Sequence, residues 1–191
     1  MKSFSFSGGA LFLAVFCWAT FAQATTVINV PLEQMTREST VIVHARVEAQ
    51  QVVQEVGTDR ILTLTAIELL SPIKGVSKGD TLTIYQVGGT LDGRTMNIIG
   101  ALKFKEGEEF ILFGVKFRDM VVSYGMGLGK YAVSKVGGIK SVVPQFGDVE
   151  RVEPDGKGGY KPAVIGATKP EPLDSFIARV KSLAATQGGA K

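Results

Sequence analysis

The sequence is poor in the residues that support sulfur and imidazole chemistry. It contains one cysteine, Cys17, and one histidine, His44. Cys17 lies in an N-terminal segment that we expect to be removed, which would leave a mature chain without cysteine. Disulfide bonds, zinc–thiolate sites and thiol catalysis are then excluded. The mature domain must be stabilised by its hydrophobic core.

Long hydrophobic runs are also scarce. The longest, residues 10–22, follows the positive charge of Lys2 and precedes the small-x-small site Ala22-Gln23-Ala24. It has roughly a dozen residues, whereas a membrane-spanning helix needs about twenty. This pattern predicts a cleaved signal peptide at 1–24, no retained membrane anchor, and a periplasmic or extracellular location.

Charge of one sign is not concentrated anywhere along the chain. The formal net charge is +3, and lysines and arginines alternate with acids. Such spreading indicates a solvated surface and argues against a nucleic-acid groove. Weak binding to a glycan or another polyanion stays open as a lesser alternative.

Alternating apolar residues predict strands separated by glycine-rich turns. The expected strands are residues 40–47, 60–70, 81–87, 108–117, 120–124 and 131–135. Ser71-Pro72 is expected to end or bend the second strand, and 108–117 is apolar enough to form the centre of the core. Without a regular βαβ alternation, the pattern favours a mainly β fold, a small closed or half-closed β-barrel.

Helical patterns flank these strands. Pro31 begins a short segment that is expected to be helical, residues 31–38. Near the other end, apolar residues recur at helical spacing: Leu173, Phe176, Ile177, Val180 and Leu183. We therefore expect one barrel domain, 25–185, with a C-terminal amphipathic helix at 173–185 and a disordered tail at 186–191.

The stretch YGMGLGKYAV, residues 124–133, resembles a phosphate-binding loop at first sight. A Walker loop requires G-x-x-x-x-G-K-[ST] with a helix after it, but here the spacing is G-x-G-x-G-K-Y and a strand follows. The glycines instead predict a bulge or tight crossing in the hairpin that closes the barrel. Lys130 is expected to be an ordinary surface charge.

No set of residues has a catalytic or metal-binding pattern. His44 is expected at the surface or edge of a strand, and the serines lack a G-x-S-x-G context. Glu106, Glu108 and Glu109 are expected to be solvated, with Gly107 in a turn. The sequence thus predicts no catalytic residue, no metal site and no cofactor.

The longest irregular stretch runs from Gly88 to about Lys105, and its part at residues 88–100 is the best candidate for a binding site. Long loops between barrel strands often carry binding residues. The candidate residues are Arg94, Thr95, Met96, Asn97, Ile98 and Ile99. The apolar ones could equally fold back as a lid on the barrel, or mark a contact patch if they are exposed together.

The order of motifs resembles a group of exported bacterial proteins without an assigned activity. The motifs that carry the resemblance are STVIVHARVEAQ, ILTLTAIELLSPIKGVSKGDTLTIY, KEGEEFILFG, GKYAV and LDSFIARV. The barrel part is also similar to the oligonucleotide/oligosaccharide-binding (OB) fold of the netrin-like superfamily, which includes the tissue inhibitors of metalloproteinases. The resemblance implies an OB-like barrel, with no catalytic motif.

Those inhibitors grip the protease zinc with an N-terminal cysteine, which the predicted first residue, Thr25, does not supply. The sequence therefore predicts a non-enzymatic binding module with a protein or peptide partner, and leaves its oligomeric state open. An inhibitor or accessory partner of a secreted protease is the alternative. A hydrolase using His44 is a weaker one.

Overall fold

The computed structural model describes residues 26–146, 149–163 and 169–188. The predicted signal peptide, 1–24, and the last part of the predicted tail, 189–191, lie outside the described residues.

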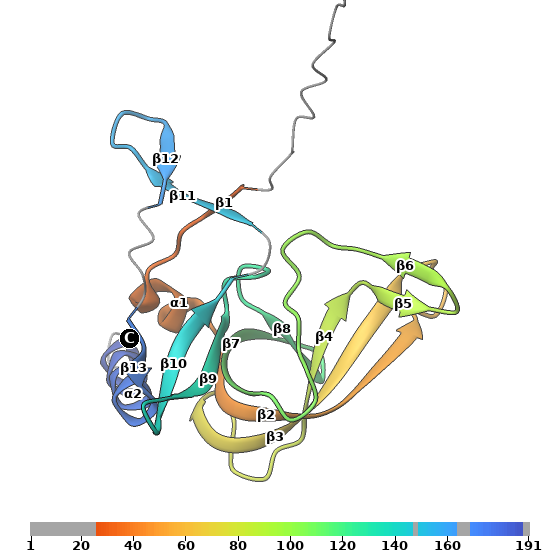
Figure 1. Ribbon diagram of the computed structural model, residues 1–191, viewed down its shortest axis with the longest axis horizontal. Coiled ribbons are helices and arrows are strands. Elements are labelled where there is room, and N and C mark those ends of the chain that lie inside the picture. The colour runs from red at the N-terminus through yellow and green to blue at the C-terminus, as the bar shows by residue number, and fades with distance from the viewer. Residues whose placement is uncertain (1–25, 147–148, 164–168, 189–191) are drawn as a thin grey trace, which may run out of the picture.

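The central feature is a closed ring of strands (Figure 1). The ring strands are β2 (Val41–Gln54), β3 (Ile61–Lys74), β4 (Leu82–Val87), β7 (Glu109–Phe117) and β8 (Met120–Ser123). They follow the order β7-β2-β3-β4-β8, and the pairing of β8 with β7 closes the ring. The β4–β8 pair is parallel, whereas the other neighbours run antiparallel. The prediction of a mainly β, barrel-like fold is confirmed.

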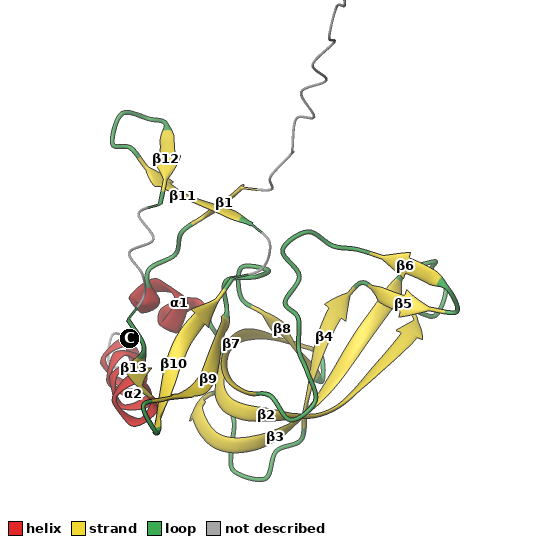
Figure 2. Ribbon diagram, in the orientation of Figure 1, coloured by secondary structure: helices red, strands yellow, loops and turns green. Residues whose placement is uncertain are grey.

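The remaining elements extend or cover this ring (Figure 2). The large sheet continues beyond β7 through β9 (Lys130–Val136), β10 (Ile139–Gln145) and β13 (Glu171–Pro172). Two smaller sheets contain β1 (Thr26–Ile28), β11 (Glu150–Pro154) and β12 (Tyr160–Pro162), and β5 (Gly89–Leu91) with β6 (Arg94–Met96). The helices are α1 (Leu32–Glu38) and α2 (Leu173–Gly188).

Strand β7 separates two hydrophobic cores. Phe110 and Leu112 point into the barrel, where they pack with the inward side chains of β2, β3 and β4. Ile111 and Phe113 point outward against α1 and α2. All four side chains are fully buried. Burial on both faces explains why this strand reads as a continuous apolar run, and its expected place at the centre of the core is confirmed.

Pro72 does not end the second ring strand, because β3 continues to Lys74. The β2–β3 register shifts on both sides of Pro72, between Ile42 and Val43 and between His44 and Ala45. Proline is tolerated there because irregular pairing does not require every backbone N–H. Of the two outcomes expected at Ser71-Pro72, the strand does not end there, and its pairing with β2 is irregular at that point.

Helix α2 is longer than predicted. Its buried stripe contains Leu173, Phe176 and Val180, which pack on the outward face of the sheet. Residues 186–188, assigned to a disordered tail from the sequence, belong to this helix. The tail prediction is wrong for these residues, since the helix continues for one turn past its apolar stripe.

The glycine-rich segment does not form a hairpin, and that prediction is wrong. Strands β8 and β9 do not pair with each other but lie one after the other along the same edge of β7. Ser123 is opposite Gly114 and Lys130 is opposite Leu112, so residues 124–129 bulge out at Phe113. Both backbone groups of Phe113 are used there: its N–H donates to Gly129 O at 2.8 Å, and its carbonyl accepts from Tyr124 N at 2.9 Å.

Gly129 is required by the tightness of this bulge. A Cβ atom at this position would lie 2.4 Å from Phe113 O and 2.8 Å from Ser123 Oγ. We expect Gly129→Ala to lower the free energy of unfolding by about 1–3 kcal/mol, since backbone must move to admit the methyl group. Urea unfolding followed by far-UV circular dichroism measures the change. The exposed β9 variant Ser134→Ala should stay within about 0.5 kcal/mol of wild type, and equal stability of both variants would contradict a tight crossing.

Tyr131, in the core between β7 and the helices, makes the stability of the protein depend on pH in the alkaline range. Its ring packs 4.9 Å from that of Phe176 and 5.4 Å from that of Phe113. Burial raises the pKa of Tyr131 to about 12, from an ordinary value of about 10. The unfolded chain therefore loses this proton first, and stability falls as the pH rises from about 10 to 12.

We expect wild type to lose about 2–3 kcal/mol more than Tyr131→Phe over that pH range. Chemical unfolding at pH 9 and pH 12 measures this difference. Tyr160→Phe is the control, because Tyr160 is 61% exposed and should follow wild type. An identical alkaline loss in Tyr131→Phe and wild type would contradict the assignment.

Candidate binding groove

The segment after β4, residues 88–104, forms an arm beside the mouth of the barrel. It begins with the β5–β6 hairpin and continues as an irregular chain to Phe104. The end of the arm is fixed, because Leu102 and Phe104 are 6% and 7% exposed and belong to the barrel core. Phe104 packs edge-on against Phe110, with their ring centroids 5.1 Å apart.

The opposite wall consists of strand residues beyond the apolar part of the barrel. Thr63 of β3, Gln86 of β4 and Gln50 of β2 lie there. Thr63 Oγ1 donates to Gly88 O at 2.7 Å, and Gln86 Nε2 donates to Leu102 O at 2.9 Å. These bonds attach the barrel wall to both ends of the arm. They hold the space between arm and wall open in a defined shape.

Arm and wall enclose a groove of about 580 Å³, within the range of small-molecule and peptide sites. Its rim carries exposed apolar side chains, since Ile98 and Ile99 are 38% and 54% exposed. Met96 is half-buried at the same rim. The groove therefore combines an apolar rim with a wall in which Gln50, Thr63 and Gln86 lie among apolar residues such as Val52 and Val87.

The structure brings together part of the predicted site. Met96, Asn97, Ile98 and Ile99 line the groove. Arg94 and Thr95 are exposed on β6 and are not part of the lining, although Thr95 Oγ1 lies 2.9 Å from Thr90 Oγ1 across the hairpin. The apolar residues form neither a lid that is fully folded back on the barrel nor a patch that is fully exposed, since Met96 is partly packed while Ile99 faces solvent.

Lys130 is buried and anchors the arm, so the prediction of a surface charge is wrong. Its side chain is 1% exposed, and its Nζ donates to Lys103 O at 2.6 Å and to Glu108 Oε1 at 2.7 Å. The ammonium also lies 4.5 Å from the centroid of the Phe104 ring. Lys130 thus joins β9, the start of β7 and the end of the arm.

The Lys130–Glu108 pair is electrostatically demanding. Burial lowers the pKa of Lys130, and the hydrogen bond from Lys130 to Glu108 partly offsets that effect. The Glu108 side chain is 19% exposed and keeps some contact with water. Removing Glu108 should therefore cost more stability than removing Lys130. Without Glu108, Lys130 would be a buried, unpaired charge, whereas Glu108 without Lys130 could be hydrated.

The prediction of three solvated acids is confirmed for Glu106, which is exposed, and is wrong for Glu108, which pairs with buried Lys130. Gly107 lies in a turn, as expected. Glu109 is not simply solvated, because its Oε1 lies 2.8 Å from His44 Nε2 and both its oxygens accept from Lys140 Nζ at 2.8 Å. Burial acts to raise the pKa of Glu109, but the bonds from Lys140 and His44 outweigh it and the pKa is lowered.

His44 does not lie at a sheet edge, since β2 pairs with β3 on one side and β7 on the other. It is 8% exposed, and its hydrogen bond with Glu109 ties β2 to β7 on the outside of the barrel. Across residues 26–146, 149–163 and 169–188, no three His, Cys, Asp or Glu side chains are grouped so that they could hold a metal ion.

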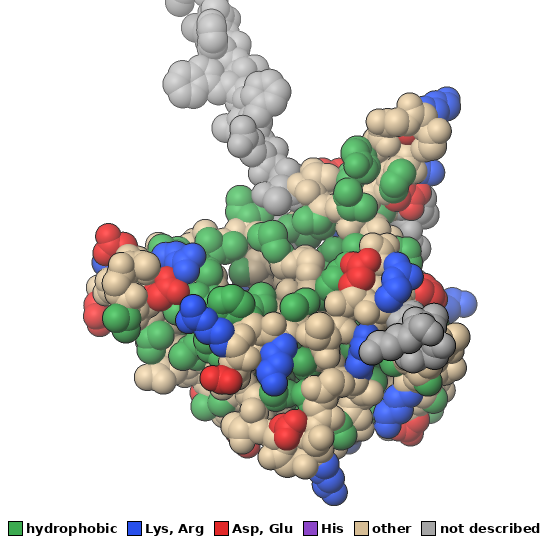
Figure 3. All heavy atoms as spheres, turned by 180° about the vertical axis from the view of Figure 1, so that it is seen from behind, with side chains coloured by type: hydrophobic (Ala, Val, Ile, Leu, Met, Phe, Trp, Pro, Cys, Tyr) green, Lys and Arg blue, Asp and Glu red, His purple; other side chains and the backbone are tan. Residues whose placement is uncertain are grey.

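On the face seen from behind, lysine and arginine side chains are mixed with acidic ones, and hydrophobic side chains gather over the upper half (Figure 3). Within the described part of the chain, no helix has the length and apolar character needed to cross a membrane.

Comparison with known proteins gives no family assignment. No protein-family model matches the chain, and no curated protein matches its sequence.

Sequence reasoning missed the polar groups of the wall and the buried anchor. Thr63 and Thr65 lie between Ile61 and Ile67 on one face of the expected strand, which was a signal that polar groups interrupt this face. Lys130 carried no such signal, because its acceptors come from a glutamate and a carbonyl group more than twenty positions away.

We expect Glu108→Ala to destabilise the protein by about 3 kcal/mol, because it leaves the Lys130 charge buried without its carboxylate. Lys130→Met should cost clearly less, about 1 kcal/mol, because methionine is apolar and Glu108 can reach water. Urea unfolding at pH 7 measures both variants, with Glu106→Ala as an exposed control that should stay near wild type. A larger loss for Lys130→Met than for Glu108→Ala would contradict the proposed asymmetry.

Proposed function

We propose that this chain is an exported, non-catalytic binding module that holds a segment of a protein or peptide partner in the groove. One observation carries the proposal: hydrogen bonds attach both ends of the arm to the barrel wall, while Ile98 and Ile99 of the groove lining remain exposed. Exposed apolar side chains beside a preformed groove are typical of protein contact sites.

The groove presents both apolar side chains and amide groups, and this combination favours a peptide over a fully apolar ligand. Burial of two isoleucine side chains contributes roughly 1.5–3 kcal/mol each. On the opposite wall, Gln50 and Gln86 each use one amide hydrogen within the protein, Gln50 toward Thr65 Oγ1 at 3.1 Å. A primary amide has a second donor and an acceptor, which suit the N–H and C=O groups of an extended backbone.

We also propose that the ring is an OB-like barrel of netrin-like type. Its support is the chain order: β2, β3 and β4 follow one another, and β7 and β8 close the ring with β8 parallel to β4. OB folds are five-stranded Greek-key barrels whose second and third strands form the binding face. The corresponding strands here, β3 and β4, supply Thr63 and Gln86 to the groove.

The proposed location is the periplasm or the extracellular space. It rests on Lys2, the apolar run at 10–22 and the small residues Ala22 and Ala24. A partner would then be a protein of the cell envelope or a secreted protein, and a secreted protease is one candidate class.

Site-specific photo-cross-linking in intact cells tests the groove. A p-benzoylphenylalanine placed at Ile99 is expected to give a defined protein adduct, because that side chain faces the proposed partner. The matched control position is Ile139 at the β9–β10 tip, which is 61% exposed against 54% for Ile99. Failure to form an adduct, or the same adducts from both positions, would reject the proposal.

The purified partner then allows the contribution of the rim to be measured. We expect Ile98→Ser/Ile99→Ser to weaken binding at least tenfold in calorimetry, from the lost apolar burial. Val136→Ser/Ile139→Ser removes a similarly exposed apolar pair and should leave the Kd within twofold. Equal weakening by the two variants would indicate a nonspecific hydrophobic contact.

A further inference from the structure

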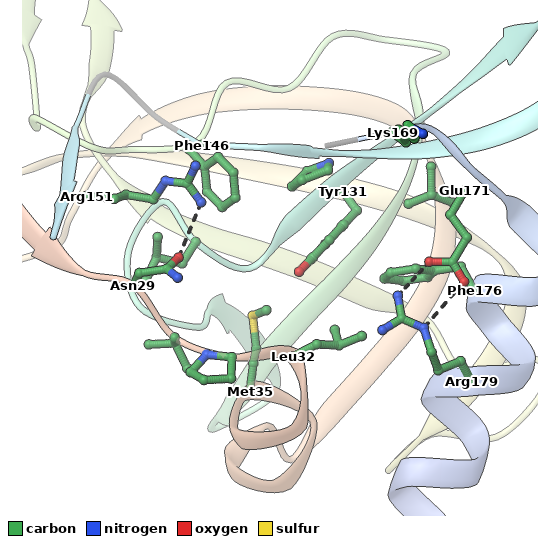
Figure 4. Close-up of a pocket in the computed structure, with 15 residues that line it drawn as sticks. Asn29, Leu32, Met35, Tyr131, Phe146, Arg151, Lys169, Glu171, Phe176 and Arg179 are labelled. Carbon is green, nitrogen blue, oxygen red and sulfur yellow. Dashed lines mark hydrogen bonds and ion pairs between the residues drawn. The ribbon is translucent and has the colours of Figure 1, made fainter. Parts of the chain in front are cut away.

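A second cavity lies at the seam between the helices and the sheets, separate from the arm. It has a volume of about 260 Å³, close to that of nine water molecules. Strands β9, β10 and β11 and both helices contribute to its lining (Figure 4). Its apolar side is formed by Leu32, Met35, Val142 and Phe176.

Arg151 of β11 is the unusual residue in this lining. It is 8% exposed, its guanidinium lies 3.5 Å from the centroid of the Phe146 ring, and its Nη1 donates to Asn29 Oδ1 at 3.3 Å. Within the described ranges, no carboxylate lies at ion-pairing distance from it. Burial lowers the pKa of Arg151, as expected for a desolvated charge with few compensating groups.

The other arginine of the cavity provides a direct comparison. Arg179 on α2 pairs with Glu171 through two nitrogens, at 2.5 and 3.3 Å (Figure 4). Its charge is therefore neutralised by protein. Arg151 has five N–H donors in a planar fork and gives one to a neutral amide oxygen, which leaves capacity for an anion.

Tyr131 adds a hydroxyl to the same space. Its side chain projects into the cavity between Arg151 and Arg179 (Figure 4). A tyrosine hydroxyl is protonated at neutral pH, so Tyr131 can donate a hydrogen bond to an anion in the cavity.

We propose that the seam cavity binds a small monocarboxylate with an apolar body. Arg151 would hold the carboxylate through its fork, Tyr131 would donate to it, and the apolar wall would cover the body. The volume limits the ligand to about ten non-hydrogen atoms, the size of phenylacetate or octanoate. This site does not depend on the groove or on the proposed protein partner.

Isothermal titration calorimetry on the chain from Thr25 to Lys191 tests the proposal with phenylacetate, hexanoate and octanoate at pH 7.4. At least one is expected to bind with a submillimolar Kd. The neutral isostere of that acid, for example phenylacetamide, should bind at least tenfold more weakly. Absence of binding by all three acids at 10 mM, or equal binding of acid and amide, would overturn the assignment.

Matched variants identify which arginine binds the carboxylate of the ligand. Arg151→Gln should abolish the preference for acid over amide, whereas Arg179→Gln should retain it. Tyr131→Phe, which keeps the ring packing, should weaken the acid about tenfold and so tests the site even if Arg151→Gln does not fold. Loss of the preference in Arg179→Gln, or unchanged affinity in Tyr131→Phe, would contradict the proposed geometry.

Discussion

The arrangement of the barrel mouth depends on the hydrogen bonds of the buried ammonium group of Lys130. Its bonds to Glu108 Oε1 and Lys103 O join three segments that are distant in sequence: the first residue of β9, the entry to β7 and the end of the arm. Phe104 closes the contact from the apolar side. The groove has a defined shape because the arm is fixed here and again at Gly88 and Leu102.

Two cores on opposite faces of one strand explain how the described residues, which include no cysteine, can hold this shape. The inward side chains of β7 fill the barrel, and its outward side chains pack against α1 and α2. The bulge at residues 124–129 allows β8 and β9 to share the same edge of β7, so the sheet both closes into a ring and continues beyond it. The helices then cover the part that continues.

Both proposed sites lie where this packing leaves polar groups without full compensation. At the barrel mouth, the apolar inward pattern gives way to Gln50, Thr63 and Gln86 beside exposed isoleucines. At the seam, Arg151 and Tyr131 face a cavity between the second core and the small sheet. Polar groups at such positions are stable when bonded, and a ligand can supply the missing partners.

The sequence is enough to predict the mainly β class, the central place of residues 108–117 and the position of the amphipathic stripe at 173–183, because these follow from local periodicity and burial. It also placed Met96, Asn97, Ile98 and Ile99 in a long segment between strands. The tertiary structure is needed to show that Lys130 is buried, that Glu109 bonds to His44, and that the bulge predicted at the glycines lies on one edge of β7 and not in a hairpin. These features depend on partners remote in the chain, and no local pattern specifies which strand edge or which carboxylate a side chain will meet.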